Sequence, residues 1–285
     1  MKAEISLFSQ LSKESILTEN DPRSLPPNAF RAALKRGRPL TGIWSMLNSV
    51  NATEALGWSG FDWLLVDGEH APVSLHDAMA HARAIAATPT VPIFRVTWND
   101  RILLKQHLDA GLSTLMIPYV QSVEEARALV DLVRYPPQGS RGIAAIHRGS
   151  RYGRLQDYAA RINQEIFVIA QIETVEALER CADIAAVDGI DAVFFGPGDL
   201  SASMGMIGQP GNPKVTEAIE DGLKRCRPTG KYIGVLSPND EISERHIRTG
   251  FDFISVANDC AVLFRNADSI GARFRGVADA SSTKR

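Results

Sequence analysis

Residues 61–70 read FDWLLVDGEH, an apolar run that ends abruptly in acidic and basic side chains. From Trp63 to Val66 every position is apolar, which is typical of a parallel strand covered on both faces. The polar residues 67–70 follow where such a strand would stop. This stretch therefore predicts a buried parallel strand with polar side chains at its carboxyl end.

Seven further apolar runs of strand length occur along the chain, separated by longer segments with helical spacing. Strands that alternate with helices favour a parallel sheet with crossover helices. Eight strands buried on both faces favour a closed barrel, so we expect an α/β fold, a TIM (β/α)8 barrel. The eight expected strands are residues 41–45, 61–67, 91–96, 114–118, 167–173, 192–196, 232–236 and 251–257.

Three segments between these runs have clear helix signals. Ser122, with Glu125 three residues later, predicts a capping box at the start of one helix. That helix should end before residues 135–137, Tyr-Pro-Pro, because proline disfavours helical geometry in the residue before it. Residues 174–186 and 99–109 are expected to form two further helices, opened by Thr174 and by Asn-Asp.

A chain of 285 residues suits one barrel with peripheral ends. We expect an N-terminal extension at 1–26, the barrel domain at 27–265 and a C-terminal tail at 266–285, with about the last ten residues disordered. Residues 138–161 form an unusually long connection, and long loops in compact domains are usually functional. This connection contains Arg141, Arg148, Arg151, Arg154 and Arg161.

Composition excludes several classes of function. Hydrophobic residues make up 45% and charged residues 22%, as in soluble globular proteins. A net charge of −2 predicts no general attraction to nucleic acid or to an anionic membrane. The widely spaced Cys181, Cys226 and Cys260 indicate reduced thiols rather than a zinc or redox site. With no signal peptide and no run of ~18 apolar residues, we expect a cytoplasmic protein.

Candidate site residues follow from the barrel, because active sites of this fold form at the carboxyl ends of the strands. Glu173 and Asp199 follow the adjacent fifth and sixth strands. Mg²⁺ and Mn²⁺ prefer a few carboxylate oxygens and complete their shell with water and substrate, so this pair is a candidate metal site. Either carboxylate alone could instead cap a helix.

Two further strand-end residues suit chemistry on an oxygen-rich substrate. A buried Arg95 needs a substrate oxygen or an internal salt bridge with Asp67 or Glu69 to offset its desolvation. His70 could be a general base, since an unperturbed histidine pKa near 6.5 suits proton abstraction. We treat the other five histidines as structural because they fall on helices or loops: His76, His81, His107, His147 and His246.

The positions of the glycines and lysines bear on how a ligand would be bound and activated. Gly196 and Gly198 would let backbone N–H groups approach a ligand carboxylate, although a tight turn would have the same glycines. Schiff-base aldolases on barrels need a lysine inside the barrel near a strand end. Of the eight lysines only Lys231 touches an expected strand, at its N-terminal side. An imine mechanism therefore lacks its nucleophile, which leaves a metal ion as the expected electrophile.

Seven motifs together resemble the HpcH/HpaI aldolase family, which includes aldolases of 4-hydroxy-2-oxoheptanedioate and of 2-oxo-3-deoxy sugar acids. They occur in order between Asn28 and Asn258. The motifs are FDWLLVDGEHAP, VPIFRV, LKQHLDAG, TLMIPYV, RYPPQGSRG, QIET and FFGPGDLSASMG. The resemblance implies a class II enzyme that reversibly cleaves a 4-hydroxy-2-oxo acid to pyruvate and an aldehyde through a metal-stabilised enolate.

The resemblance also implies a role for each matching residue. Glu173 and Asp199 would hold Mg²⁺, Mn²⁺ or Co²⁺, and Arg95 would contact the pyruvyl carbonyl oxygen. His70 would be the acid/base, acting through water and supported by Asp67 and by Asp109 of a neighbouring subunit. Gln171 and the amides of Gly198 and Asp199 would contact the substrate. A homohexamer built from two trimers is the assembly that the resemblance implies.

Alternatives remain open at this stage. After Arg141-Gly142 the loop IAAIHRGSRYGR is about one residue shorter than the family pattern, which leaves the aldehyde partner open. A citryl- or malyl-CoA-type lyase of the wider superfamily would use a similar enolate, but it would need a thioester-binding surface. A non-catalytic 2-oxo acid binding protein would need no base such as His70.

Overall fold

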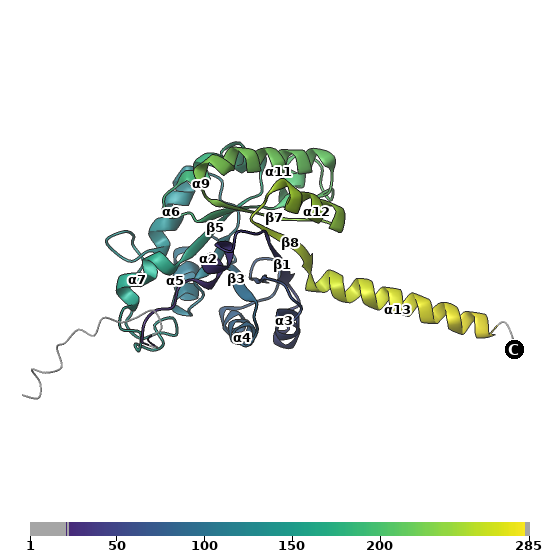
Figure 1. The fold of residues 1–285 in the computed structure, drawn as a ribbon, viewed down its shortest axis with the longest axis horizontal. Coiled ribbons are helices and arrows are strands. Elements are labelled where there is room, and N and C mark those ends of the chain that lie inside the picture. The colour runs from purple at the N-terminus through teal and green to yellow at the C-terminus, as the bar shows by residue number, and fades with distance from the viewer. Residues whose placement is uncertain (1–20, 22, 283–285) are drawn as a thin grey trace, which may run out of the picture.

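The structure is a computed structural model that describes residue 21 and residues 23–282. Eight parallel strands close into a barrel in sequence order, which confirms the expected (β/α)8 fold (Figure 1). Every strand begins and ends within two residues of its expected bounds. The strands are β1 Leu40–Ser45, β2 Trp63–Asp67, β3 Val91–Arg95, β4 Thr114–Ile117, β5 Phe167–Ile172, β6 Ala192–Phe195, β7 Tyr232–Leu236 and β8 Phe253–Asn258.

Burial on both faces of the strands explains their nearly continuous apolar sequences. In β2, Trp63 and Leu65 belong to the cluster inside the barrel, whereas Leu64 and Val66 pack in the layer between strands and helices. Space inside the barrel is limiting at Gly42 of β1, where an added Cβ would lie 2.1 Å from the Trp63 ring. The strands therefore need apolar residues at alternate positions on both sides, and a glycine where a large ring crosses.

A short helix closes the N-terminal end of the barrel. Helix α2, Ala29–Leu34, begins at Asn28, whose side chain accepts the Arg31 N–H. Phe30 of α2 packs edge-on against aromatic rings at the starts of three strands, with ring centroids 5.2–6.5 Å apart. This aromatic plug fills the N-terminal end of the barrel and leaves the polar residues at the opposite, carboxyl end.

Helices surround the barrel, with α3 and α4 on one side and α11 and α12 on the opposite side (Figure 1). The remaining helices are α3 Val50–Gly57, α4 Leu75–Ile85, α5 Arg101–Asp109, α6 Val123–Val133, α7 Tyr158–Glu165, α8 Val175–Glu179, α9 Cys181–Ala186, α10 Pro197–Ser203, α11 Pro213–Cys226, η1 Arg227–Thr229, α12 Asp240–Thr249 and α13 Asp259–Ser282. No helix among the described residues is both long and apolar enough to cross a membrane.

The expected helix starts are right in position but partly wrong in detail. Ser122 caps α6 by accepting the Glu125 N–H at 3.1 Å. The Glu125 carboxylate accepts the N–H of Gln121 rather than that of Ser122, so the reciprocal capping box does not form. The helix expected at 174–186 is divided into α8 and α9 because Arg180 leaves helical geometry, with φ −107° and ψ 9°.

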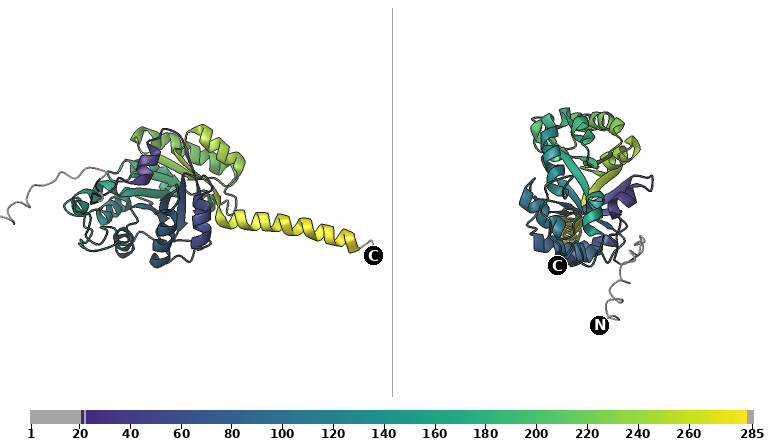
Figure 2. Two further views of the ribbon diagram at one scale, coloured as in Figure 1. Left: turned by 60° about the horizontal axis from the view of Figure 1, so that its bottom comes forward. Right: turned by 90° about the vertical axis from the view of Figure 1, so that its left-hand side faces the viewer.

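Residues 266–282 of the C-terminal tail are helical, which corrects the expectation of disorder for residues 276–282. Helix α13 runs continuously across the expected domain boundary at residue 265 and extends away from the barrel as a single rod (Figures 1 and 2). Residues 259–282 contain no proline and many alanines, so nothing in the sequence interrupts the helix. Residues 1–20 of the expected extension and 283–285 of the tail lie outside the described residues.

The arginine-rich connection lies at the N-terminal end of the barrel, because it leaves α6 and leads through α7 into the start of β5. Arg141 is fully buried and pairs with Asp109 at 2.6 Å. Arg148 donates to the carbonyl oxygen of Ala110 at 2.6 Å. Within its own chain this connection is therefore packed against the end of α5, at the opposite end of the barrel from the strand-end residues.

Candidate active site

The strand-end residues of β2 and β3 form a buried ionic cluster. The Arg95 Nε and Nη2 atoms donate to the two carboxylate oxygens of Asp67 at 2.9 and 2.7 Å. The Arg95 Nη1 atom lies 2.6 Å from the Glu69 carboxylate. Both ion pairs considered from the sequence are thus present, and they offset the desolvation of a guanidinium that is almost fully buried.

The Arg95 guanidinium is held in a fixed orientation, and some of its N–H groups remain available to a ligand. Its Cζ atom lies 4.3 Å from the centroid of the Trp44 ring, so the group is also held by a cation–π contact. A guanidinium has five N–H donors, and Asp67 and Glu69 engage three of its nitrogens. The second N–H on each terminal nitrogen stays available to a substrate oxygen.

Asp67 and His70 are brought close, through the backbone of the turn that carries His70. Asp67 accepts the backbone N–H groups of Glu69 and His70 at 3.0 and 3.3 Å, so it shapes the turn that presents His70. The His70 side chain is 56% exposed, and its Nε2 lies 4.0 Å from the Glu69 carboxylate. Most of the imidazole therefore faces outward, accessible to a ligand or another chain.

Glu173 follows β5 and is almost completely buried. One carboxylate oxygen accepts the Tyr119 N–H at 2.8 Å, and the other accepts the Gln171 side-chain amide at 2.5 Å. Burial raises the pKa of Glu173 to about 8, with the charges of Glu69 and Asp199 adding to the effect and the Tyr119 N–H and Arg95 opposing it. A Cβ on Gly196 would lie 2.7 Å from this carboxylate, so only glycine fits there.

Asp199 lies in the first turn of α10, a helix that begins at Pro197, and Gly198 beside it is exposed. No atom lies within 4 Å of a Cβ added at Gly198. Its backbone N–H belongs to the first turn of α10, where N–H groups have no acceptor within the helix and can meet a ligand. The charge of Asp199 acts on the pKa of both Glu173 and Glu69. These three carboxylates thus surround one region at the carboxyl end of the barrel.

The residues around Glu173 fit a hard divalent cation. Carboxylates crowded together in a poorly solvated place need a cation or protons to balance their charge. The side-chain oxygen of Gln171 is buried next to them and has no hydrogen-bond donor among the described residues. No group of three or more His, Cys, Asp or Glu residues in the described chain could hold a metal alone. An ion here would use two carboxylates and complete its shell with water and substrate.

Three residues contribute to this site although the sequence analysis did not identify them as site residues. Tyr119 acts through its backbone N–H, which has no signature in sequence, and its φ of 53° is uncommon for a non-glycine residue. Trp44 is the penultimate residue of β1 and lies inside an ordinary apolar run. Glu69 was considered only as a salt-bridge partner, yet burial raises its pKa. The DGEH sequence could have indicated Glu69, because it directly follows a buried strand.

Asp109 is the one candidate that the structure does not bring to this site. It ends α5 at the N-terminal end of the barrel and pairs with Arg141 at 2.6 Å. Its side chain remains 25% exposed. The His70 ring of the same chain lies at the other end of the barrel, so only Asp109 of another chain could meet it.

Residues expected to be structural have structural contacts. His81 bonds to Thr53 and Asn48, His107 to the Leu103 carbonyl oxygen and His246 to Ser237. His147 contacts the carbonyl oxygen of Asp109. Lys231 donates to the Ile190 carbonyl oxygen at the N-terminal end of the barrel, away from the strand-end carboxylates. The three cysteines are free thiols.

Comparisons with known proteins identify the family of this chain. The model of the HpcH/HpaI aldolase/citrate lyase family matches residues 40–266. A 4-hydroxy-2-oxo-heptane-1,7-dioate aldolase of Escherichia coli is 44% identical over 254 residues, which are 89% of this chain and 97% of that protein.

Two solved structures have the same fold at lower sequence identity. One is an HpcH/HpaI aldolase/citrate lyase family protein of Burkholderia cenocepacia, with a TM-score of 0.83, 34% identity and coverage of 87% of this chain and 99% of that one. The other is the citrate synthase SbnG, with a TM-score of 0.78, 28% identity and coverage of 87% and 98%. The chain therefore belongs to the HpcH/HpaI aldolase/citrate lyase family and is a carbon–carbon lyase.

Proposed function

We propose that this protein is a divalent-metal-dependent class II aldolase that cleaves a 4-hydroxy-2-oxo acid to pyruvate and an aldehyde, and catalyses the reverse reaction. The observation that supports this most is the meeting of Glu173, Asp199 and Arg95 at one end of the barrel. The two carboxylates could bind a cation, and they lie beside the fixed guanidinium of Arg95. This arrangement suits a 2-oxo acid, whose adjacent carbonyl and carboxylate oxygens need both kinds of partner.

In this proposal the two carboxylates Glu173 and Asp199 hold Mg²⁺, Mn²⁺ or Co²⁺. The ion, when bound, supplies electrophilic stabilisation for the enolate that forms on cleavage. Gln171 fixes the orientation of Glu173 through their 2.5 Å hydrogen bond. The backbone amides of Gly198 and Asp199, in the first turn of α10, donate to the substrate carboxylate.

Arg95 and His70 act on the reacting atoms. Two free N–H groups of Arg95 donate to the oxygen at C2, where negative charge grows as the C3–C4 bond breaks. His70, acting through a water molecule, takes the proton from the C4 hydroxyl, and the aldehyde leaves. Return of a proton to C3 of the enolate then gives pyruvate. Asp67 fixes the position of Arg95 relative to the turn that carries His70, because it accepts four hydrogen bonds from them.

We also propose that the active site is completed in a homo-oligomer, a hexamer of two trimers. Asp109 of a neighbouring chain would orient the exposed His70 ring. Helix α13 supports assembly, because Leu263, Ile270 and Phe274 repeat along it and each residue is more than half exposed. In this proposal a second copy of the chain packs against this apolar stripe. Nothing in this proposal involves nucleic acid or a membrane, and a cytoplasmic location suits it.

The relatives narrow the substrate but do not fix it. The name of the Escherichia coli relative refers to a seven-carbon 4-hydroxy-2-oxo diacid, and we propose an acid of this class or a 2-oxo-3-deoxy sugar acid for this chain. A CoA-thioester lyase or a non-catalytic 2-oxo acid binding protein are the alternatives. An exposed His70 ring at the carboxyl end of the barrel favours catalysis over binding alone, since a binding protein needs no base.

A panel of substrates tests the proposal. Purified protein with Mg²⁺, Mn²⁺ or Co²⁺ is incubated with 4-hydroxy-2-oxo acids and with citryl- and malyl-CoA, and pyruvate, oxaloacetate, glyoxylate and acetyl-CoA are measured. We expect pyruvate from the 4-hydroxy-2-oxo acids only. Cleavage of a thioester alone would favour the CoA-type lyase, and binding of pyruvate without turnover of any compound would favour the binding protein.

A further inference from the structure

A chain of buried polar side chains lies beside the turn that carries His70 and has no role in the steps described so far. It runs through four residues whose exposed fractions are 3% or less: Asp259, Ser45, Thr53 and His81. These residues belong to α13, β1, α3 and α4, next to the apolar layer between strands and helices. Buried polar groups are costly unless each has a partner, so a continuous chain of them favours one arrangement of these elements.

Each member of this chain lies within hydrogen-bond distance of the next. The Ser45 hydroxyl lies 3.2 Å from Oδ2 of Asp259 and 2.9 Å from Oγ1 of Thr53. Thr53 Oγ1 lies in turn 2.9 Å from Nδ1 of His81. Four separate elements of the fold are therefore joined through their side chains.

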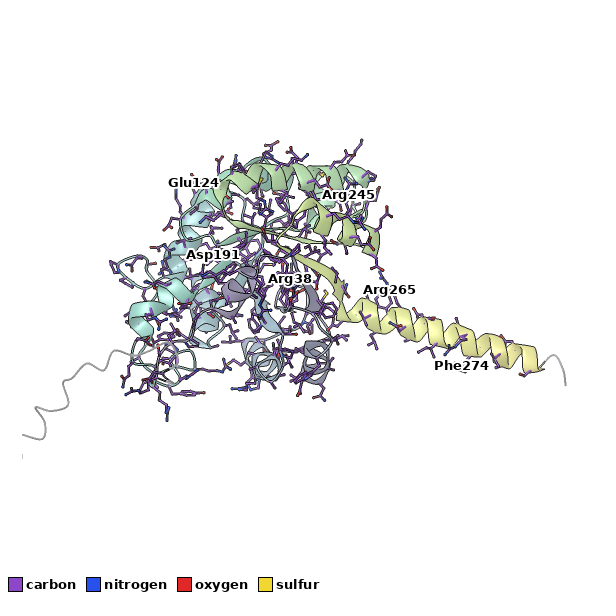
Figure 3. All side chains as sticks on the ribbon, in the orientation of Figure 1. Arg38, Glu124, Asp191, Arg245, Arg265 and Phe274 are labelled. Carbon is purple, nitrogen blue, oxygen red and sulfur yellow. The ribbon has the colours of Figure 1, made fainter. Side chains whose placement is uncertain are left out.

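The chain begins where α13 joins the barrel. Asp259 accepts the backbone N–H groups of Met46 and Leu47 at 2.9 and 3.1 Å, so it holds the loop that follows β1. Arg265 marks the end of α13 nearest the barrel (Figure 3). The loop that carries Asn48 is therefore fixed at the start of this helix.

At its other end the chain reaches the His70 turn, residues 67–72, through Asn48. The Asn48 side chain donates from Nδ2 to the Pro72 carbonyl oxygen at 2.8 Å, and its Oδ1 lies 3.0 Å from Nε2 of His81. Asn48 has a φ of 48°, in the left-handed region that favours glycine. The backbone alone would thus suit glycine, and the asparagine side chain adds a link between α4 and the turn.

The proton positions in this part of the chain follow from its end. A carbonyl oxygen only accepts, so the amide nitrogen of Asn48 faces Pro72 and the amide oxygen faces His81. Nε2 of His81 therefore carries a proton. Burial lowers the pKa of His81, with the charges of Asp77 and Asp259 opposing this effect. The ring is therefore neutral near neutral pH, and Nδ1 is left as an acceptor for the hydroxyl beside it.

The His70 turn is held from both neighbouring strands. On the β3 side, the Gly68 N–H donates to the Arg95 carbonyl oxygen at 2.9 Å, and the Thr97 hydroxyl donates to the Gly68 carbonyl oxygen at 2.8 Å. On the β1 side, Asn48 holds the last residue of the turn. His70 lies between these anchors with its ring exposed, so the backbone of the turn determines where the imidazole is presented.

We propose that Asn48 and His81 are positioning residues for His70: His81 fixes the amide of Asn48, and Asn48 fixes the C-terminal end of the His70 turn. In this proposal neither residue contacts the substrate. Both act through the position of the imidazole, on which transfer of the C4 hydroxyl proton depends. The inference rests on the proposed aldolase function and adds to it two residues that lie outside the strand-end cluster.

Amide hydrogen exchange measured by mass spectrometry tests the hold on the turn without any substrate. Asn48→Gly suits the backbone and removes the side chain, whereas Asn48→Asp keeps the shape but cannot donate to a carbonyl oxygen. We expect both variants to raise exchange severalfold in a peptide covering residues 68–73. Asn212→Gly, which removes the side-chain cap of α11, is the matched control and should leave that peptide as in wild type. Wild-type exchange in both Asn48 variants would overturn the proposal.

Kinetics tests whether the hold serves His70. We expect kcat for pyruvate release from a 4-hydroxy-2-oxo acid to fall roughly 10-fold in Asn48→Gly, with inhibition by pyruvate unchanged, because a small displacement of an acid/base residue is costly. In a His70→Ala background the same substitution should cause no further fall, since Asn48 acts through His70. His81→Leu should behave like Asn48→Gly. His81→Gln, whose side-chain amide can donate from near the position of Nε2, should regain part of kcat.

The possible results separate the positioning role from the proposed function. If Asn48→Gly lowers kcat equally in the wild-type and His70→Ala backgrounds, Asn48 supports the fold in general and the positioning role is wrong. If the wild-type protein is active and Asn48→Gly keeps its full kcat, the positioning role is likewise wrong, and the aldolase proposal survives. If the wild-type protein cleaves no 4-hydroxy-2-oxo acid with Mg²⁺, Mn²⁺ or Co²⁺, the proposed function fails and this inference with it.

Discussion

Single residues in this site serve two purposes, and Arg95 is the clearest case. It neutralises Asp67 and Glu69 at 2.6–2.9 Å, which is a structural role, and it keeps two N–H groups for a ligand. Sequence alone singled out Arg95, Glu173 and Asp199 as candidates, because Arg95 ends a buried strand and the other two closely follow buried strands. It could not locate the Tyr119 contact to Glu173, because that contact uses a backbone N–H.

Replacement of Arg95 by lysine separates the structural and catalytic roles. An ammonium group can still neutralise one carboxylate, but it cannot reproduce the planar fork that meets Asp67, Glu69 and the C2 oxygen together. We expect kcat of Arg95→Lys to fall by roughly 10²-fold or more. The thermal midpoint is measured alongside. A variant with lowered stability and near-normal turnover would assign Arg95 to the salt bridges alone.

Among the elements, strands were easier to predict than helix ends. Strands of the barrel are buried on both faces, so β7 and the other strands are marked by apolar runs with sharp limits. Helix ends depend on local hydrogen bonds with several equivalent solutions. Glu125 could bond to Ser122 or Gln121, and it bonds to Gln121. Helix α13 was missed at its C-terminal end because exposed small and charged residues are also typical of disorder.

The contact of His246 in α12 with Ser237, the residue that follows β7, gives a pH dependence of stability. His246 of α12 is buried, its Nδ1 bonds to Ser237 at 2.8 Å, and its Nε2 has no partner among the described residues. Burial lowers the pKa of His246 to about 4, with Arg245 adding to the effect and Glu220 opposing it. The unfolded chain, with a histidine pKa near 6.5, therefore binds this proton more readily. Stability from neutral His246 is fully present above about pH 6.5 and is lost as pH falls toward 4.

Urea unfolding of wild type and of His246→Phe at about pH 7.5 and about pH 5 measures this effect. The free energy of unfolding of wild type should fall by about 2 kcal/mol more than that of the variant across this interval. His76→Gln, at an exposed position, should keep the wild-type pH dependence. An equal fall in wild type and His246→Phe would contradict the assignment of the pH effect to this histidine.

At the scale of the whole molecule, the isolated chain looks incomplete at two places. Helix α13 projects from the barrel with its apolar stripe uncovered (Figure 1). The exposed side of Asp109 lies at the N-terminal end of the barrel, whereas His70 lies at the other end. Neither feature could be interpreted fully from one sequence, since both concern surfaces that another chain would cover. An active site shared between two chains accounts for the placement of Asp109 and His70 at opposite ends of the barrel.

Complementation between inactive variants tests the shared site. Asp109→Ala and His70→Ala are each expected to lose most activity, and Asp109→Ala keeps its His70 intact. When the two proteins exchange subunits, some interfaces unite an intact Asp109 with an intact His70, so part of the activity should return. Exchange is followed by labelled subunits. Verified exchange without recovered activity, or a fully active monomer, would show that the site is not shared.

The most direct test of the central claim, a metal-dependent retro-aldol reaction at Glu173, Asp199 and Arg95, is the rate of pyruvate release from a 4-hydroxy-2-oxo acid before and after removal of divalent metal. The account predicts that EDTA abolishes the rate and that Mg²⁺, Mn²⁺ or Co²⁺ restores it, because the described lysines offer no imine at the strand ends. A full rate in excess EDTA, with pyruvate trapped on a lysine by borohydride, would contradict it.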